Sequence, residues 1–100
     1  MEFKQLEMFV AVAEERSIMR AAVRVFRTQP AVSMALAKLE EEVGSRLFHR
    51  SRELRFHLTS AGEVLHEYAK RLLALRDEAA RLVTRRAVPT CSPLPETSAS

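Results

Sequence analysis

Apolar residues recur at helical spacing in two segments that open the chain. In residues 3–15 they stand three or four positions apart, which predicts a helix with one buried face. These residues are Phe3, Leu6, Phe9, Val10 and Ala13. Ser17 is then a candidate N-cap for a short second helix, whose apolar positions are Ile18, Ala21, Ala22 and Val25. The adjacent alanines would let another helix approach closely, as a helix-turn-helix requires.

A third helix is predicted to begin at Thr28 after a very short connection. The Thr28 hydroxyl can cap the first free N–H groups, and Pro30 suits the first turn because its missing N–H costs little there. The buried face is predicted to comprise Val32, Leu36, Leu39 and Val43. Gly44 suits a left-handed C-cap. No glycine marks the preceding turn, where only Phe26 and Arg27 separate the two helical patterns, so the third helix should leave at a steep angle.

The opposite side of this third helix is short, polar and poor in carboxylates near its start. Small or hydrogen-bonding side chains there could approach the edge of a DNA base. The candidate base-contacting residues are Gln29, Pro30, Ser33 and Met34, with Ala37 beside them. The acidic run at residues 40–42 lies further along, so a polyanion would meet the N-terminal half. An ordinary amphipathic helix is the alternative interpretation.

Beyond Gly44 the pattern changes from helical spacing to alternation. Residues 47–50 and 54–58 alternate or nearly alternate, which predicts two short strands joined as a hairpin, a wing. Arg50, Arg52 and Arg55 would stand on or near this wing and could reach phosphates or a narrow minor groove. Thr28 and Lys38 complete the predicted backbone-contacting set. A basic face that simply contacts solvent is the alternative.

A long helix is predicted from Thr59 or Ser60, either of which can cap it, to Arg86. Apolar residues recur with alternating steps of three and four, the a/d pattern of a coiled coil. This predicted dimer interface comprises Leu65, Tyr68, Leu72, Leu75, Ala79 and Leu82. About 27 residues would extend roughly 40 Å, longer than so small a domain can cover. Dimerisation is therefore favoured over packing on the chain's own domain.

The charges beside this seam favour an antiparallel pair of helices. A parallel pair would place Arg71 against Arg76 of the partner, which is repulsive. An antiparallel pair sets Leu72 against Leu75 and brings Arg71 near Glu78. Exposed charge pairs contribute only about 0 to 1 kcal/mol, so they can do no more than tip the choice.

The resulting fold class is mainly α: a winged helix-turn-helix of three helices and a β-hairpin over residues 1–58, followed by a linker and dimerisation helix over 59–86. Residues 87–100 contain three prolines and no apolar periodicity, and we expect a disordered tail. The N-terminus lacks the basic and apolar blocks of a signal peptide, and no apolar run approaches the roughly 18 residues of a membrane span. A cytoplasmic location is expected.

The distribution of charge indicates the class of partner. The chain has a net charge of +3, but residues 16–58 hold eight arginines and one lysine against four glutamates. Arginine stays charged and its fork matches phosphate oxygens, so this segment suits nucleic-acid contact. An enzyme is not expected, because His49, His57 and His66 lack metal-ligand spacing and no glycine-rich phosphate loop is present. Cys91 lies in the tail and is taken as incidental. No cofactor or metal is expected.

Six blocks of the sequence, in order, resemble the N-terminal DNA-binding region of LysR-type transcriptional regulators. They are FVAVAEE (9–15), RAA (20–22), QPAVS (29–33), LEEEVG (39–44), LFHR (47–50) and LTSAG (58–62). The resemblance covers about residues 1–86. It implies a winged helix-turn-helix, a linker helix that pairs antiparallel with that of another subunit, and a third helix inserted in the major groove of a dyad-symmetric site.

Position by position, the resemblance implies base contacts by Gln29, Pro30 and Ser33 and phosphate or minor-groove contacts by Arg50 and Arg52. This wing is about one residue longer than is usual in the family. Where Met34 stands, the family often has a basic or amide residue. Apolar contact with thymine methyl groups is therefore our hypothesis for this position.

The function expected from these observations is sequence-specific binding of double-stranded DNA as a homodimer, by a transcriptional regulator of LysR type. The sequence leaves assembly into oligomers larger than a dimer undecided, and no membrane partner is expected. The ligand-binding domain into which family members usually continue has no counterpart in these residues, so no small-molecule effector site is expected here. The alternative is a helical interaction module that dimerises and antagonises a longer relative without itself contacting DNA.

Overall fold

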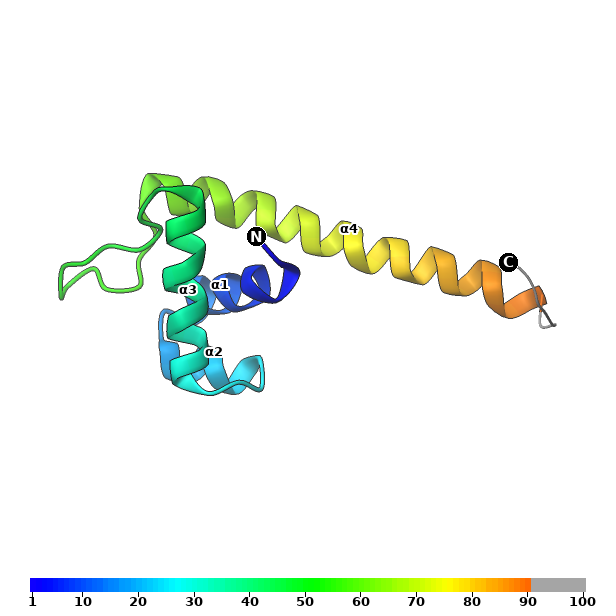
Figure 1. The fold of residues 1–100 in the computed structure, drawn as a ribbon, viewed down its shortest axis with the longest axis horizontal. Coiled ribbons are helices and arrows are strands. Elements are labelled where there is room, and N and C mark those ends of the chain that lie inside the picture. Colours follow the sequence, from blue (N-terminus) through cyan, green and yellow to red (C-terminus); the bar gives the residue numbers. More distant parts are fainter. Residues whose placement is uncertain (91–100) are drawn as a thin grey trace.

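The computed structural model of the protein describes residues 1–90, and the surroundings of side chains for residues 1–86. It contains four helices in this part of the chain: α1 (Phe3–Glu15), α2 (Ile18–Arg24), α3 (Gln29–Val43) and α4 (Ser60–Thr90). The first three form a small bundle, and α4 passes over it and projects far beyond (Figure 1). The molecule measures 57 × 25 × 20 Å as a result. The expected mainly helical fold, with three helices before a long fourth, is confirmed.

Helix α1 lies at the centre of the bundle because α2, α3 and α4 all pack against it. Phe9 and Val12 have no exposed surface, and the alternation of buried and exposed positions is lost in the middle of the helix. The prediction that Phe3 is buried is wrong. Its ring is 46% exposed, at the start of the helix, and lies 5.3 Å below the guanidinium of Arg76 from α4.

Helices α2 and α3 form a helix-turn-helix whose local signals match the sequence. The Ser17 hydroxyl accepts a hydrogen bond from the N–H of Arg20 at 3.1 Å, and that of Thr28 accepts one from the N–H of Ala31 at 3.2 Å. The two expected N-caps are confirmed, as is Gly44, which ends α3 in the left-handed conformation. In the turn between the helices, Phe26 adopts the left-handed position with φ of 58°.

Most of the predicted buried face of α3 is confirmed. Val32 and Leu39 are fully buried and Leu36 nearly so. Val43 differs, because it is 38% exposed at the last turn of the helix, where the chain leaves the bundle. The opposite face of α3 is left open to solvent over its N-terminal half.

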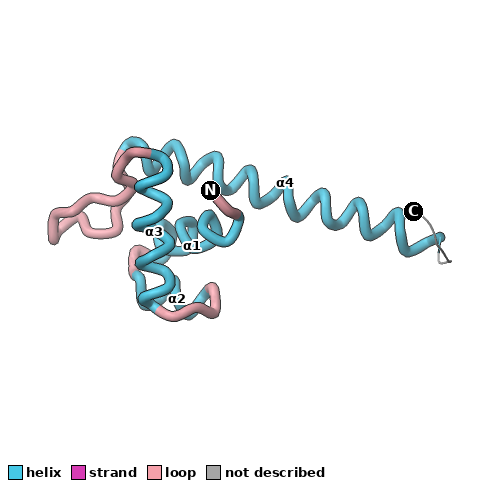
Figure 2. Tube along the Cα trace, in the orientation of Figure 1, coloured by secondary structure: helices cyan, strands magenta, loops and turns pink. Residues whose placement is uncertain are grey.

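Residues 47–58, which we call the wing, form a hairpin-like loop rather than two regular strands (Figure 2). Its pairing is limited to isolated β-bridges, Phe48 with Leu58 and His49 with Arg55. Phe48 anchors it to the bundle, packing 5.5 Å from the ring of Phe9. The wing contains no Gly, Asn or Pro to make a tight turn, and Phe56 interrupts the extended backbone with φ of 66°.

Helix α4 begins where the wing returns to the bundle. The hydroxyl of Thr59 accepts a hydrogen bond from the N–H of Gly62 at 3.1 Å and donates one to the carbonyl of Arg46 at 2.6 Å, so Thr59 rather than Ser60 is the cap. The helix continues to Thr90, four residues beyond the predicted end, because helix propagation does not require the apolar pattern to persist. The rest of the predicted tail, with Cys91, lies outside the described residues.

Candidate nucleic-acid interface

The four candidate base-contacting residues share one exposed face of α3. Gln29, Pro30 and Ser33 are exposed, and Met34 is 72% exposed although it is apolar. Their common orientation follows from helical geometry, because the buried residues on the other side hold this face outward. The cap at Thr28 gives the helix a defined start, so these side chains stand at the outer end of the helix-turn-helix.

A groove of about 450 Å³ separates this face from the wing. On the α3 side it is lined by Ser33 and Ala37. The wing contributes Arg50, Arg52 and Arg55, the three arginines singled out in the sequence. The structure therefore brings the exposed face of α3 and the predicted phosphate-contacting residues to the two sides of one groove.

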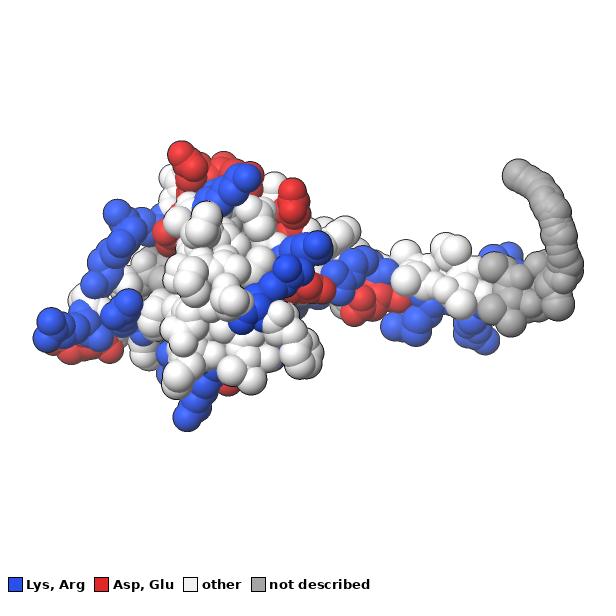
Figure 3. Space-filling view, turned by 60° about the horizontal axis from the view of Figure 1, so that its bottom comes forward, with Lys and Arg blue, Asp and Glu red and all other residues white. Residues whose placement is uncertain are grey.

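The wing arginines are free to meet an anion. No described residue forms an ion pair with Arg50, Arg52 or Arg55. Arg55 rests over the ring of Phe56, with its guanidinium carbon 5.0 Å from the ring centre. In the space-filling view the wing end, at the left, carries mostly basic side chains, next to a broad uncharged surface (Figure 3). Lys38 is also exposed, one turn beyond Met34.

Glu40 has a role that the sequence did not indicate. One carboxylate oxygen of this residue accepts a hydrogen bond from the N–H of Leu47 at 2.8 Å and so ties α3 to the start of the wing. In the sequence it belongs to a run of three glutamates, and nothing local distinguishes it from Glu41 and Glu42. Its position fixes where the wing begins relative to the exposed face of α3.

The predicted dimer seam is largely exposed along α4. The exposed fraction is 54% for Tyr68, 61% for Leu75 and 50% for Leu82, and Leu72 and Ala79 are also exposed. Two further apolar residues, Val64 and Val83, are more than half exposed on α4 but were not assigned to the seam. We call seven of the exposed apolar residues of α4 the apolar stripe: Val64, Tyr68, Leu72, Leu75, Ala79, Leu82 and Val83.

Leu65 differs from the rest of the predicted seam. It is half-buried and packs against the domain's own core, together with Leu73, while Ala69 between them has no exposed surface. The sequence pattern alone did not separate the two apolar faces, because a helix of period 3.6 drifts against a repeat of seven. The first half of α4 thus uses one face for its own domain and leaves the other free.

The described residues contain no cluster of His, Cys, Asp or Glu that could hold a metal ion. Among the described helices, none combines the length and apolar character needed to cross a membrane.

A family model described as "Bacterial regulatory helix-turn-helix protein, lysR family" matches residues 3–63. Among curated proteins, the chain is 47% identical over 79 residues to the HTH-type transcriptional regulator BudR of Klebsiella aerogenes. That match covers 79% of this chain and 54% of the relative. It is also 40% identical over 81 residues to the HTH-type transcriptional regulator TfdT of Cupriavidus pinatubonensis, covering 81% of this chain and 35% of the relative.

Solved structures resemble this one over nearly the whole described chain. The crystal structure of the BenM DBD in complex with catB site 1 DNA has a TM-score of 0.80 and 38% identity, covering 87% of this chain and 96% of that one. The complex of the CbnR DBD with DNA has a TM-score of 0.79 and 36% identity, covering 87% of this chain and 99% of that one.

The match to full-length BenM covers only part of that longer protein. It has a TM-score of 0.77 and 36% identity and covers 84% of this chain but only 27% of that one. Among the curated relatives, the chain likewise spans about half the length of BudR and about a third of the length of TfdT. Six ordered sequence blocks, the helix-turn-helix with its wing, and these matches agree: the chain belongs to the lysR family of bacterial regulatory helix-turn-helix proteins and has the winged helix-turn-helix DNA-binding domain of LysR-type transcriptional regulators.

Proposed function

We propose that this chain binds double-stranded DNA at specific sequences as a homodimer and thereby regulates transcription in the cytoplasm. The observation that carries the proposal is the groove between α3 and the wing. One of its sides is α3, with the small residues Ser33 and Ala37 and, further along the helix, Glu40. The other holds three arginines that form no ion pair with any described residue. The first suits contact with base edges and the second suits contact with phosphates.

Helix α3 is the element that enters the major groove in this proposal. Gln29 can form paired hydrogen bonds with adenine, and Ser33 can donate to or accept from several bases. Met34, exposed and apolar, can contact thymine methyl groups. Pro30 and Ala37 present little bulk, so the backbone of α3 can approach the duplex closely.

The wing and the residues around α3 position the protein on the duplex. Arg50, Arg52 and Arg55 can contact phosphates or enter the adjacent minor groove, where charge is concentrated. Lys38 and the exposed end at Thr28 add backbone contacts. Such contacts contribute affinity that depends on salt and carry no sequence information of their own.

Dimerisation is assigned to the apolar stripe of α4. Exposed apolar residues at successive turns need a partner surface, and a second copy of the helix supplies a matching one. We favour the antiparallel arrangement, with Leu72 against Leu75. The attraction between Arg71 and Glu78 across the dimer is secondary, because within one chain Arg71 already pairs with Glu67 at 3.2 Å.

The names of the similar proteins support the DNA partner. The BenM and CbnR structures are complexes of a DBD with DNA, and they resemble this fold with TM-scores of 0.80 and 0.79. BudR and TfdT are named transcriptional regulators. An interaction module that does not contact DNA is not favoured, since the α3 face and wing remain exposed.

Selection from a random pool of duplex DNA tests the proposal. The chain is incubated with the pool, bound sequences are amplified over several rounds, and the enriched sequences are examined for two-fold symmetry. We expect two similar half-sites related by a dyad. A control variant with Gln29→Ala and Ser33→Ala should enrich a weaker and less defined motif. Failure to enrich any sequence over the starting pool would contradict the proposal.

A further inference from the structure

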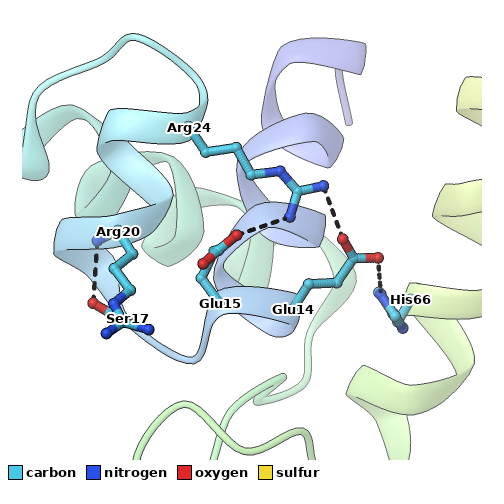
Figure 4. A network of polar contacts seen from close by, with 6 residues as sticks. All are labelled: Glu14, Glu15, Ser17, Arg20, Arg24 and His66. Atoms are coloured by element: carbon cyan, nitrogen blue, oxygen red, sulfur yellow. Dashed lines mark hydrogen bonds and ion pairs between the residues drawn. The ribbon is translucent and has the colours of Figure 1, made fainter.

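A single carboxylate of α1 touches both α2 and α4. One oxygen of Glu14 lies 2.8 Å from Nη2 of Arg24, and the other lies 3.5 Å from Nε2 of His66 (Figure 4). The second terminal nitrogen of Arg24 reaches Glu15 at 3.4 Å. Glu14 is therefore shared between the helix-turn-helix and the long helix, whereas Glu15 contacts the helix-turn-helix alone.

The surroundings of this contact hold both groups in place. The side chain of His66 is only 20% exposed, and its ring meets that of Phe9 edge to face at 6.3 Å. Its Nε2 atom is buried and has no hydrogen-bond partner within the described residues, and the carboxylate of Glu14 approaches it to 3.5 Å. Burial raises the pKa of Glu14, but the hydrogen bond and charge of Arg24, with His66, outweigh it and lower the pKa. The carboxylate is therefore held in its charged form.

A second contact joins α4 to the other end of α1. Nη1 of Arg76 lies 2.7 Å from a carboxylate oxygen of Glu7, and its guanidinium covers the ring of Phe3. Arg76 follows His66 by ten positions, about 15 Å along the helix. Between the two contacts, Ala69 has no exposed surface and belongs to the same buried core as Phe9 of α1. Two polar contacts thus bracket a close apolar contact.

We propose that the Glu14–His66 and Glu7–Arg76 contacts set the angle between α4 and the helix-turn-helix and thereby determine which half-site spacing the dimer accepts. All four are positioning residues, since they act through α4 and not on DNA. This inference rests on the proposed dimeric DNA binding, because the spacing between two α3 helices depends on how each α4 leaves its domain. Inserting one base pair rotates a half-site by about 35° and moves it by about 3.4 Å.

The test compares two double variants with the same change of charge. Glu7→Gln with Glu14→Gln weakens both contacts between α1 and α4. Glu15→Gln with Glu67→Gln is the matched control, because Glu15 pairs with α2 and Glu67 pairs with Arg71 inside α4. Both variants lose two negative charges, so any general gain in affinity for DNA is the same in each.

The angle is measured without DNA, by pulsed electron resonance between two spin labels. The labels are attached at Glu41→Cys on α3 and Ala80→Cys on α4, both exposed and neither assigned to the dimer contact, in a chain carrying Cys91→Ser. Labelled chains are diluted into an excess of unlabelled ones so that only distances within a chain are recorded. We expect one narrow distance distribution for the parent and the control, and a broader one for Glu7→Gln with Glu14→Gln. An equally narrow distribution would overturn the proposed role of the two contacts.

The spacing is measured on the selected site with one base pair inserted or removed between its half-sites. The parent and the control should favour the original spacing to the same degree. For Glu7→Gln with Glu14→Gln we expect that preference to fall by about two- to fivefold, an effect that two weak salt bridges can produce. A broadened distance distribution with unchanged spacing preference would overturn the proposal. If neither the parent nor any variant enriches a DNA sequence, the proposed function is wrong, and the proposed role in half-site spacing is wrong with it. The spin-label distances would still test whether the two contacts set the angle between α4 and the helix-turn-helix.

Discussion

Gly62, in the first turn of α4, lies so close to the carbonyl oxygen of Leu47 that a Cβ atom at that position would overlap it. The same atom would lie 2.9 Å from Cδ2 of Leu58. The absence of a side chain at Gly62 therefore lets the start of α4 pack directly on the start of the wing. This contact and the cap at Thr59 position the wing relative to the long helix.

We predict that Gly62→Ala destabilises the protein although alanine is the better helix former. Helix propensity alone would favour alanine by about 1 kcal/mol. The overlap is with backbone, which cannot rotate away, and overpacking of this kind typically costs about 1–3 kcal/mol. After this offset we expect a net loss of up to about 2 kcal/mol, measured by urea unfolding followed by circular dichroism. Gly44→Ala serves as a comparison, since nothing lies within 4 Å there and only the left-handed φ of 73° is disfavoured.

Replacing the α3 residues should change sequence choice more than general affinity. We expect Gln29→Ala or Ser33→Ala to weaken binding to the selected site by about 1–3 kcal/mol and to relax preference at one base pair. Binding to random duplex DNA should hardly change, because phosphate contacts remain. Fluorescence anisotropy with both duplexes measures this. Equal losses on the two duplexes would exclude base contact by the replaced residue.

Arg52→Ala should lower general affinity for DNA more than it changes sequence preference. Arg52 is exposed on the wing without an ion-pair partner among the described residues, so its removal affects little within the domain. We expect weaker binding to specific and random DNA alike, and a salt dependence of log affinity that is shallower by about one. A titration at several salt concentrations measures the slope. An unchanged slope would show that Arg52 contacts no phosphate.

A charge placed on the apolar stripe of α4 should separate the dimer. Leu75 is 61% exposed in one chain, so Leu75→Asp leaves the monomer's core intact but would bury an unpaired carboxylate in the interface. We expect the mass to halve in analytical ultracentrifugation. Ala74→Asp introduces the same charge at an exposed position about a quarter turn away and should remain dimeric. If the Leu75→Asp chain remained a dimer, dimerisation through the apolar stripe would be contradicted.

Acid should weaken the protein partly through Glu14. The pKa of this carboxyl is lowered in the folded chain: burial raises it, but Arg24 and His66 favour the charged form more strongly. A lowered folded pKa contributes stability above the unfolded value, and this contribution is lost as the pH falls through the folded value. We therefore expect unfolding midpoints to decline less between neutral pH and pH 3 in Glu14→Gln than in the parent. Parallel curves would show that Glu14 has no such role.

The turn between α2 and α3 should be open to stabilisation. Phe26 has a left-handed backbone and is 92% exposed, so its ring contributes little to packing. Replacing it by glycine relieves a conformation that costs a residue with a Cβ about 1–2 kcal/mol, offset in part by the flexibility of glycine when unfolded. We expect Phe26→Gly to stabilise by about 0.5–1 kcal/mol in urea unfolding. Phe26→Ala retains the Cβ and should change stability far less.

Much of the fold was predictable because its signals are local. The caps at Ser17 and Thr28 act on N–H groups within three residues, and the periodicity of α3 records which side is buried. The sequence predicted the position of the wing in the chain but not its irregular backbone. Its isolated bridges depend on how Phe48 packs against Phe9 and on an irregular backbone at Phe56, neither of which alternation describes.

The candidate site divides in the same way. Exposure of Gln29 and Ser33 could be predicted from helical spacing, and their contact with bases stays a prediction. That Ser33 and Arg52 line the same groove could not be predicted, because it depends on the path of the wing around α3. The sequence also could not assign Leu65 to the chain's own core. An apolar residue on a helix can pack against its own domain or against a second copy, and the spacing of apolar residues does not distinguish the two.

The sequence by itself therefore determined the order of the helices, where most of them begin, and the composition of the exposed face of α3, since each of these depends on residues within a turn or two. Only the tertiary structure decided which partners distant residues meet. Glu14 and Glu15 are chemically identical neighbours, yet only Glu14 reaches His66 on α4. Side-chain contacts between helices depend on how the helices cross, and crossing is a property of the packed bundle rather than of any segment within it.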